Sequence, residues 1–304
     1  MHWYFLAFLS PLLWAISNHV DKYILGRYLK NANSGVIAIF VGIIGLFFSL
    51  AVLLFYHGNI LGIGIINGII IILNGALLII AYIPYYYALN TEDASSVVPL
   101  YQTIPIFSFI LGFLILKETI TPFQAIAGIF IIFGAVLISI DFSKFKIGFK
   151  IKPLFLMLLS SLLIAVHFLI FKFIATEGTF WRTVFWEYLG AAAVALYLLI
   201  FMNNYRREFV ILIRENSFFV ILINVINEIL NIGGKLCANY ATLLVPLVIV
   251  NLANGLQPMF VFLIGLFITI FLPFLGKEEI TKKHLTQRIV AIVILLVGTF
   301  MLVY

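Results

Sequence analysis

The residues best suited to chemistry lie within one apolar segment, from Asn224 to Ala241. Its polar members are a carboxylate, an ammonium group and four amides: Asn224, Asn227, Glu228, Asn231, Lys235 and Asn239. At about 100° per residue of an α-helix, they fall within an arc of roughly 120°. An acid or base at the centre of a membrane helix costs about 2.5–3.5 kcal/mol. This polar face must therefore contact protein or water instead of lipid.

Two interpretations of the polar face stay open. The amides favour a seam, in which Asn side chains form hydrogen bonds with a neighbouring helix. Glu228 and Lys235 favour the wall of a cavity, because charges inside a membrane usually line a pathway. In a cavity, Lys235 would hold a carboxylate, and Glu228 would bind an ammonium group or exchange a proton. This pair of charges predicts a zwitterionic solute such as an amino acid, with proton coupling as one option.

Other apolar segments carry polar or aromatic residues at comparable depth. The candidate cavity residues outside the first segment are Trp14, Asn18, Lys22, Asn74, Tyr82, Tyr86, His167, Lys172, Asn251, Asn254 and Gln257. Lys22 and Lys172 have an alternative role, since long basic side chains can reach the membrane surface. His167 is either a hydrogen-bonded interior residue or a proton relay. We expect Glu187 to pair with Arg182 or to have no identifiable partner.

No motif indicates an enzyme. His19, Asp21 and His167 could be drawn as a catalytic group, but they lack metal-ligand spacing and a nucleophile. The single cysteine, Cys237, excludes an intrachain disulfide. We therefore expect no enzymatic activity, cofactor, metal site or nucleic-acid partner, and we keep a non-transporting membrane scaffold as an alternative.

The composition indicates which elements position these residues. The chain of 304 residues is 64% hydrophobic and 10% charged, whereas soluble domains are about 45–50% apolar and about 25% charged. Apolar runs long enough to cross a bilayer lie near residues 3–21, 35–56, 62–89, 95–116, 121–140, 153–175, 180–202, 217–240, 244–272 and 286–303. The first run lacks the basic start of a signal peptide, so we expect a retained helix. These runs predict an all-α integral membrane protein with about ten transmembrane helices.

The chain also contains an internal repeat. At a shift of 153 residues the matching pairs are Asn74 and Asn227, Tyr87 and Tyr240, Pro105 and Pro258, Phe107 and Phe260, and Gly112 and Gly265. Lys22 matches Lys172 at a shift of 150, and "KETIT" (117–121) matches "KEEIT" (277–281). The halves, 1–145 and 146–304, then hold five helices each. Because five is odd, the second half is inverted, as in many secondary transporters with a central site.

Two prolines occupy equivalent positions in these halves. Pro105 and Pro258 fall inside the fourth and ninth apolar runs. A proline inside a helix removes one backbone hydrogen bond and bends the helix. We expect both to act as hinges beside a central cavity.

Several segments resemble the EamA-like family of the drug/metabolite transporter superfamily. They are "LLWAISNHVDKYIL" (12–25), the stretch 86–121 from "YYALNTEDASS" to "LKETIT", and "GKEEIT" (276–281), so the resemblance spans nearly the whole chain. Lys117 stands where the family usually has glycine before Glu118. The resemblance implies ten helices around a cavity and transport of small metabolites. It leaves the solute, the coupling ion and the oligomeric state open.

We therefore predict a secondary transporter, acting as an exporter, for a small polar or amphipathic metabolite. A lipid-headgroup flippase subunit is a close alternative. The partners would be the solute and the bilayer, in the plasma membrane of a prokaryote. Of the 18 basic residues, fourteen lie at one face of the ten helices, including those of the loop "NNYRREF" (203–209). Because basic loops stay in the cytoplasm, we predict external termini, although members of the family usually keep both termini inside.

Overall fold

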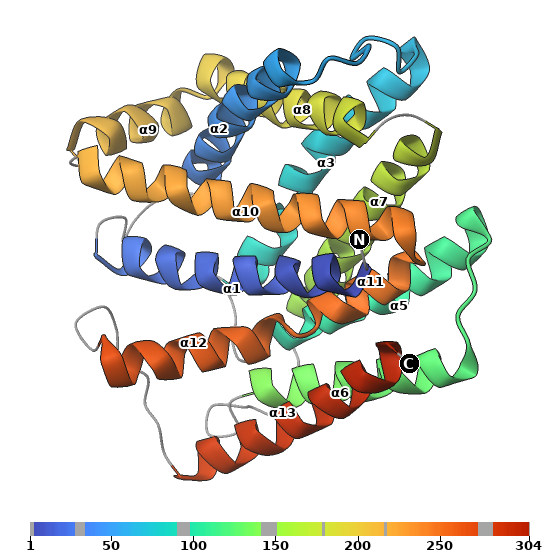
Figure 1. Ribbon diagram of the computed structural model, residues 1–304. Helices are drawn as coiled ribbons and strands as arrows, with labels where there is room; N and C mark the ends of the chain where they lie inside the picture. Colours follow the sequence, from blue (N-terminus) through green and yellow to red (C-terminus); the bar gives the residue numbers. More distant parts are fainter. Residues whose placement is uncertain are drawn as a thin grey trace.

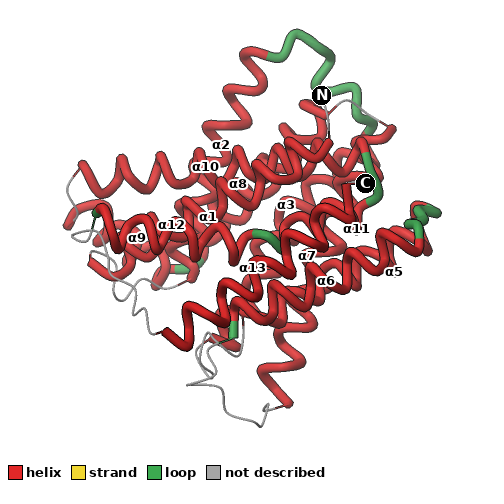
Figure 2. The backbone as a smooth tube through the Cα atoms, turned by 60° about the horizontal axis from the view of Figure 1, so that its bottom comes forward, coloured by secondary structure: helices red, strands yellow, loops and turns green. Residues whose placement is uncertain are grey.

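The computed structural model describes residues 3–27, 34–89, 98–140, 151–177, 180–215, 218–272 and 282–303. In these ranges the regular elements are helices joined by short loops (Figures 1 and 2). The first half contains α1 (Trp3–Arg27), α2 (Ser34–Phe55), α3 (Ile65–Leu89), η1 (Val98–Thr103), α5 (Ile104–Leu111), η2 (Gly112–Leu116) and α6 (Pro122–Ser139). The second contains α7 (Ile151–Glu177), α8 (Phe180–Phe201), α9 (Asn203–Glu215), α10 (Phe218–Leu244), α11 (Leu247–Asn254), α12 (Gln257–Phe271) and α13 (Lys282–Val303).

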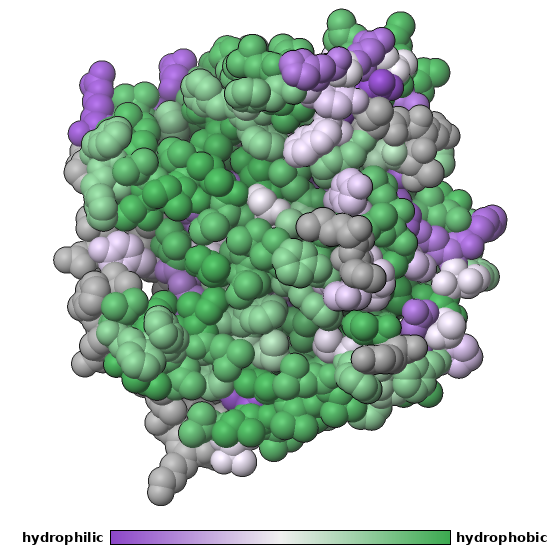
Figure 3. Space-filling view, viewed as in Figure 1, coloured by the Kyte–Doolittle hydropathy of each residue, from purple (hydrophilic) through white to green (hydrophobic). Residues whose placement is uncertain are grey.

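Most of these helices are suited to a membrane. Within the described residues, eight segments are long and apolar enough to cross a bilayer. They are Ala38–Phe55, Ile65–Tyr85, Pro122–Ser139, Ile151–Ala175, Phe180–Phe201, Phe218–Leu244, Leu247–Phe271 and Leu285–Val303. Apolar side chains cover most of the face seen in Figure 3, and polar side chains gather near its edges. The other two predicted runs correspond to α1 and to the shorter apolar segment Leu100–Leu116.

Several helix pairs pack in the combinations that the predicted repeat would produce. α1 packs along α10, and α3 packs along α7, which are equivalent pairs if the second half repeats the first. α2 packs along α8, and α6 packs along α13, so each of these helices contacts its own equivalent. One pair differs. α3 packs closely on α8, whereas α10 has few contacts with α2.

Glycines explain the close contact between α3 and α8. A Cβ atom added at Gly75 would lie 1.9 Å from the carbonyl oxygen of Glu187. A Cβ atom at Gly190 would lie 2.0 Å from the carbonyl oxygen of Ile72. Small residues let helix backbones approach in a membrane. At the predicted shift of 153 residues, the position of Gly75 is taken by Glu228 in α10.

The two repeat-related prolines begin helical segments. Pro105 lies in the first turn of α5, directly after the 3₁₀-helix η1. Pro258 lies in the first turn of α12, after a short break that follows α11. A first-turn proline forfeits no intrahelical hydrogen bond. The structure therefore differs from the expectation of prolines inside a continuous helix, since the chain is already interrupted before each of them. Their role as hinges stays a prediction.

The end of the fourth predicted run has an unusual backbone. The π-helix η2 ends at Lys117, whose φ of 58° is in the left-handed region. Glycine adopts this conformation without the clash that a Cβ atom causes. This explains why the family that the sequence resembles usually has glycine here. A capping box of Thr121 and Gln124 then starts α6.

The segment 203–209 was predicted to be a loop, but it forms the start of the helix α9. Tyr205, Phe209 and Leu212 are half-buried on one side, while Arg206 and Arg207 are exposed. Their spacing of three and four residues is typical of an amphipathic helix. The segment is too polar and too short to register as a membrane span, which is why the search for long apolar runs missed it.

Candidate functional site

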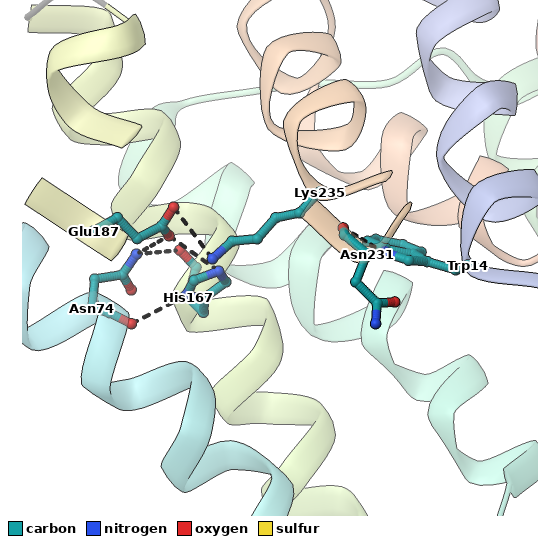
Figure 4. Close-up of polar contacts among 6 residues, drawn as sticks. All are labelled: Trp14, Asn74, His167, Glu187, Asn231 and Lys235. Atoms are coloured by element: carbon teal, nitrogen blue, oxygen red, sulfur yellow. Dashed lines mark hydrogen bonds and ion pairs between the residues drawn. The ribbon is translucent and has the colours of Figure 1, made fainter. Parts of the chain in front are cut away.

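A buried ion pair lies at the centre of the candidate site. Glu187 of α8 is 0% exposed, and its Oε2 lies 3.3 Å from Nζ of Lys235 in α10, which is 12% exposed (Figure 4). The same Nζ atom lies 4.7 Å from the centre of the Tyr188 ring, within the range of a cation–π interaction. Glu187 therefore pairs with Lys235 and not with Arg182, which donates to the carbonyl of Gly62 at 2.9 Å.

Asn74 and His167 extend this pair into a network across four helices. Asn74 Nδ2 lies 3.3 Å from Oε1 of Glu187 and also donates to the carbonyl oxygen of His167 at 3.2 Å. The His167 ring places Nδ1 3.2 Å from the carbonyl oxygen of Asn74, and Nε2 3.3 Å from Oε1 of Glu187. Figure 4 shows the four side chains converging from α3, α7, α8 and α10. Both Asn74 and His167 are 1% exposed, so His167 is a hydrogen-bonded interior residue.

The energetics explain why these groups occur together. A charged group removed from water costs several kcal/mol unless a partner of opposite charge and further hydrogen bonds compensate. Glu187 has Lys235 as its counter-ion and Asn74 as a hydrogen-bond donor. The glycine contacts bring the backbones of α3 and α8 together beside Glu187. The network therefore holds α10 against the packed pair α3–α8.

A second group of acids lies further along the polar face of α10. Asn227 Nδ2 donates to Oδ1 of Asp21 in α1 at 2.6 Å. Glu228 lies one turn before Asn231 on this face and is near enough to Asp21 for their charges to interact. Tyr82 of α3 and Tyr188 of α8 also lie within electrostatic range of Glu228. Within the described residues, no cation lies within ion-pair distance of Glu228.

The remaining residues of the α10 face contact their own helix or α1. Trp14 Nε1 donates to the carbonyl oxygen of Asn231 at 3.3 Å (Figure 4). Trp14 also packs over Gly234, where an added Cβ atom would lie 2.7 Å from Nε1. Asn224 donates to the carbonyl of Val220, one turn earlier in α10. Trp14 therefore joins α1 to α10, whereas Asn224 bonds only within its own helix.

The polar residues of α11 form a seam with α5. Asn251 Nδ2 lies 2.9 Å from Oγ of Ser108 and 3.3 Å from the carbonyl oxygen of Leu247. Asn254 donates to Oδ1 of Asn251 at 3.4 Å. Gln257 occupies the first turn of α12. The two asparagines thus hold the two broken segments together where they cross.

A second ion pair lies near the start of α1, at the turn between α10 and α11. Lys172 of α7 pairs with Oε1 of Glu118, in the loop after η2. Lys172 also donates to the carbonyl of Val245 at 2.7 Å, while Oε2 of Glu118 accepts from the backbone N–H of Leu247 at 2.7 Å. Both side chains are largely buried. Lys172 therefore forms an ion pair that joins the two halves and does not extend to the membrane surface.

The other predicted site residues are placed as follows. Asn18 is exposed on α1, Tyr82 is 41% exposed on α3, and Asn239 is buried in α10. The side chains of Lys22 and Tyr86 lie outside the described part of the structure. Their assignment to a cavity, like that of the whole residue set, stays a prediction.

Sequence reasoning missed three acids that the structure brings to these contacts. In the sequence analysis, Asp21 is only part of a weak catalytic option and Glu118 is only part of a repeat motif. Glu187 is expected there to pair with Arg182 or to have no identifiable partner. A signal was present, because each occurs beside or within an apolar run in a chain with only 12 acidic residues. A search for the buried counter-ions of Lys235 and Lys172 would have pointed to Glu187 and Glu118.

The comparisons with known proteins agree with this architecture. Residues 1–140 match the model of the EamA-like transporter family. An uncharacterized protein of Methanocaldococcus jannaschii is 37% identical over 109 residues, which cover 34% of this chain and 74% of the relative. One solved crystal structure, described only as that of a protein, has a TM-score of 0.72 at 12% identity, with 98% of this chain and 95% of the other covered. That likeness concerns the fold alone. The apolar helices and the family match support an integral membrane protein, whose residues 1–140 belong to the EamA-like transporter family.

Proposed function

We propose that the protein is a secondary transporter that moves a small polar or amphipathic metabolite across a prokaryotic plasma membrane by alternating access, and that it acts as an exporter. The observation that carries the proposal is the one-sided polar face of α10. Glu228 and Asn231 lie on this face of an otherwise apolar helix, and α10 barely contacts its neighbour α2. Intramembrane charges of this kind usually mark a solute or ion pathway.

Alternating access requires one end of the bundle to close while the other opens. The contacts among Lys172, Glu118 and the turn between α10 and α11 support closure of one end in this structure. If the second half repeats the first, the opposite end would carry an equivalent arrangement, and the two ends could exchange roles. We propose that breakage of the Lys172–Glu118 pair accompanies opening at the end where α1 begins.

The solute contacts proposed here differ from the initial expectation for Lys235. That residue already has Glu187 as its counter-ion and Tyr188 as a ring contact. A solute carboxylate would have to displace Glu187 from it. We therefore propose that Lys235 mainly holds the bundle together and that Glu228 is the principal group for the solute.

Reconstitution into proteoliposomes tests the proposal. Vesicles with the purified protein are loaded with a panel of radiolabelled amino acids, amines and organic acids, and efflux and counterflow are measured against empty vesicles. The proposal predicts saturable movement of at least one class, and loss of that movement in Glu228→Gln. The absence of movement of every solute from well-folded protein would contradict transport, whereas movement that is unchanged in Glu228→Gln would contradict only the role of Glu228 in it.

A further inference from the structure

We infer that the solute is bound through a positively charged amine group, held by Glu228 next to Asp21 and flanked by the rings of Tyr82 and Tyr188. The inference rests on the proposed transport function and specifies the chemical class of the solute. The ligand would be a small organic ammonium ion, or a metabolite that carries one.

The acids beside α10 do not all have a basic partner. Glu187 and Glu118 each have a lysine within ion-pair distance. Asp21 and Glu228 have only amide donors, Asn227 and Asn231, in the part of the chain that the structure describes. Two neighbouring acids in apolar surroundings are unfavourable unless a cation or protons neutralise them. An ammonium group between them supplies that charge.

Two buried polar atoms near Glu228 lack a hydrogen-bond partner among the described residues. Tyr188 is 5% exposed, and Asn227 is 1% exposed. The hydroxyl of Tyr188 and Oδ1 of Asn227 have no hydrogen-bond partner within the described residues. Asn227 contacts Asp21 through its other amide atom, and Tyr188 is within electrostatic range of Glu228. Because both free atoms can accept hydrogen bonds, they suit the N–H donors of an ammonium group.

Aromatic rings supply the remaining surroundings. The Tyr188 ring already carries the Nζ atom of Lys235 at 4.7 Å, so its face accepts a cation in this protein. Tyr82 on α3 is 41% exposed and lies within electrostatic range of Glu228. Tyrosine faces attract ammonium ions within about 6 Å of the ring centre. A carboxylate in the same place would meet two acids and no free lysine among the described residues.

The two halves carry different residues at the position of Glu228. In α3, Gly75 allows the backbone to pack directly on α8. Glu228 occupies the equivalent position in α10, and the equivalent contact with α2 is nearly absent. A helix that needed only to pack would keep the glycine. The acid therefore lies at the place where the second half departs from close packing.

Direct binding tests this assignment. The protein in nanodiscs of zwitterionic lipid is titrated calorimetrically with four probes that share one aromatic ring: 2-phenylethylammonium, its N-trimethyl derivative, 2-phenylethanol and 3-phenylpropionate. Empty nanodiscs correct for partitioning into lipid. The variants are Glu228→Gln and Asp21→Asn, with Glu208→Gln on α9 as the matched control. Thermal melts confirm that each variant is folded.

We expect the two ammonium probes to bind at least tenfold more tightly than the alcohol or the carboxylate. Glu228→Gln should weaken ammonium binding by on the order of 10–100-fold, the usual effect of losing a hydrogen bond to a charged group. Asp21→Asn should weaken it less, and Glu208→Gln should leave it unchanged. Binding of the carboxylate as tightly as the ammonium, equal ammonium affinity in Glu228→Gln, or no ammonium binding to the folded wild type would each overturn the inference.

The transport assay separates this inference from the proposed function. If ammonium probes bind through Glu228 but no solute moves in proteoliposomes, the transport function fails and the binding site stands. If an anionic solute is transported equally by wild type and Glu228→Gln, the ammonium site fails and transport of another class stands.

Discussion

The Glu187–Lys235 pair should behave as a strongly coupled unit when its members are removed singly. The perturbations are Glu187→Gln, Lys235→Met and the double variant. At 3.3 Å and an effective dielectric constant of about 20, two unit charges attract by about 5 kcal/mol. Removal of one member of a buried pair typically costs about 3–5 kcal/mol, because the other charge remains buried without compensation.

The two single variants should differ in size. Lys235→Met leaves a carboxylate that is 0% exposed, with Asn74 and His167 as its neighbours. Glu187→Gln leaves an ammonium group that keeps the Tyr188 ring. We therefore expect losses near 5 kcal/mol for Lys235→Met and near 3 kcal/mol for Glu187→Gln. The double variant should lose no more than about 2 kcal/mol, since it buries no unpaired charge.

Equilibrium unfolding in mixed detergent and dodecyl sulfate micelles measures these free energies for all four proteins. The double-variant cycle then isolates the coupling between the two side chains. Additive losses in the double variant, or single losses below about 1 kcal/mol, would refute a buried ion pair that stabilises the contact between α8 and α10.

Further predictions concern the backbone, the closed end and the orientation. Lys117→Gly should raise the free energy of unfolding by about 1 kcal/mol, because glycine relieves the left-handed φ of 58°; a decrease in the same unfolding assay would contradict this. Gly75→Leu should prevent stable folding, because even a Cβ atom would lie 1.9 Å from a carbonyl oxygen of α8; a monodisperse gel-filtration peak with an unchanged melting temperature would contradict that clash. Glu118→Lys and Lys172→Glu should each reduce transport, and the double variant with both exchanges should recover part of it. A double variant no more active than the single variants would contradict the pairing. A reporter active only in the cytoplasm, fused after Tyr304, should give little signal, whereas a strong signal would place both termini inside.

The helices could be predicted largely from the sequence because lipid imposes a length of about 20 apolar residues on each span. The apolar runs therefore match the helices to within a few residues at most ends. The break between α11 and α12 was not predicted, because Asn254, Gly255 and Leu256 interrupt neither the apolar composition nor the length of the run. α9 was missed because its apolar face covers only part of a short, charged helix.

The site could be predicted only in part. The spacing of Glu228 and Lys235 placed both on one face of a helix, which follows from helical geometry alone. The residues around them depend on which helices pack against α10, and the periodicity of the sequence does not predict this packing. Glu187 reaches Lys235 because α8 packs on α3 through glycines, and Asp21 reaches Asn227 because α1 packs along α10.

The most direct test of the account is whether the polar face of α10 is reached by water from both sides of the membrane in turn. Asn231→Cys in a Cys237→Ala background provides the reporter. Ile226 is 49% exposed on the opposite side of α10, so Ile226→Cys in the same background provides a lipid-facing control. A membrane-impermeant thiosulfonate is applied to right-side-out and inverted vesicles. The account predicts modification of Asn231→Cys from both sides, slowed by a bound solute, with no reaction of Ile226→Cys. Modification from neither side, or from one side only under every condition, would contradict alternating access.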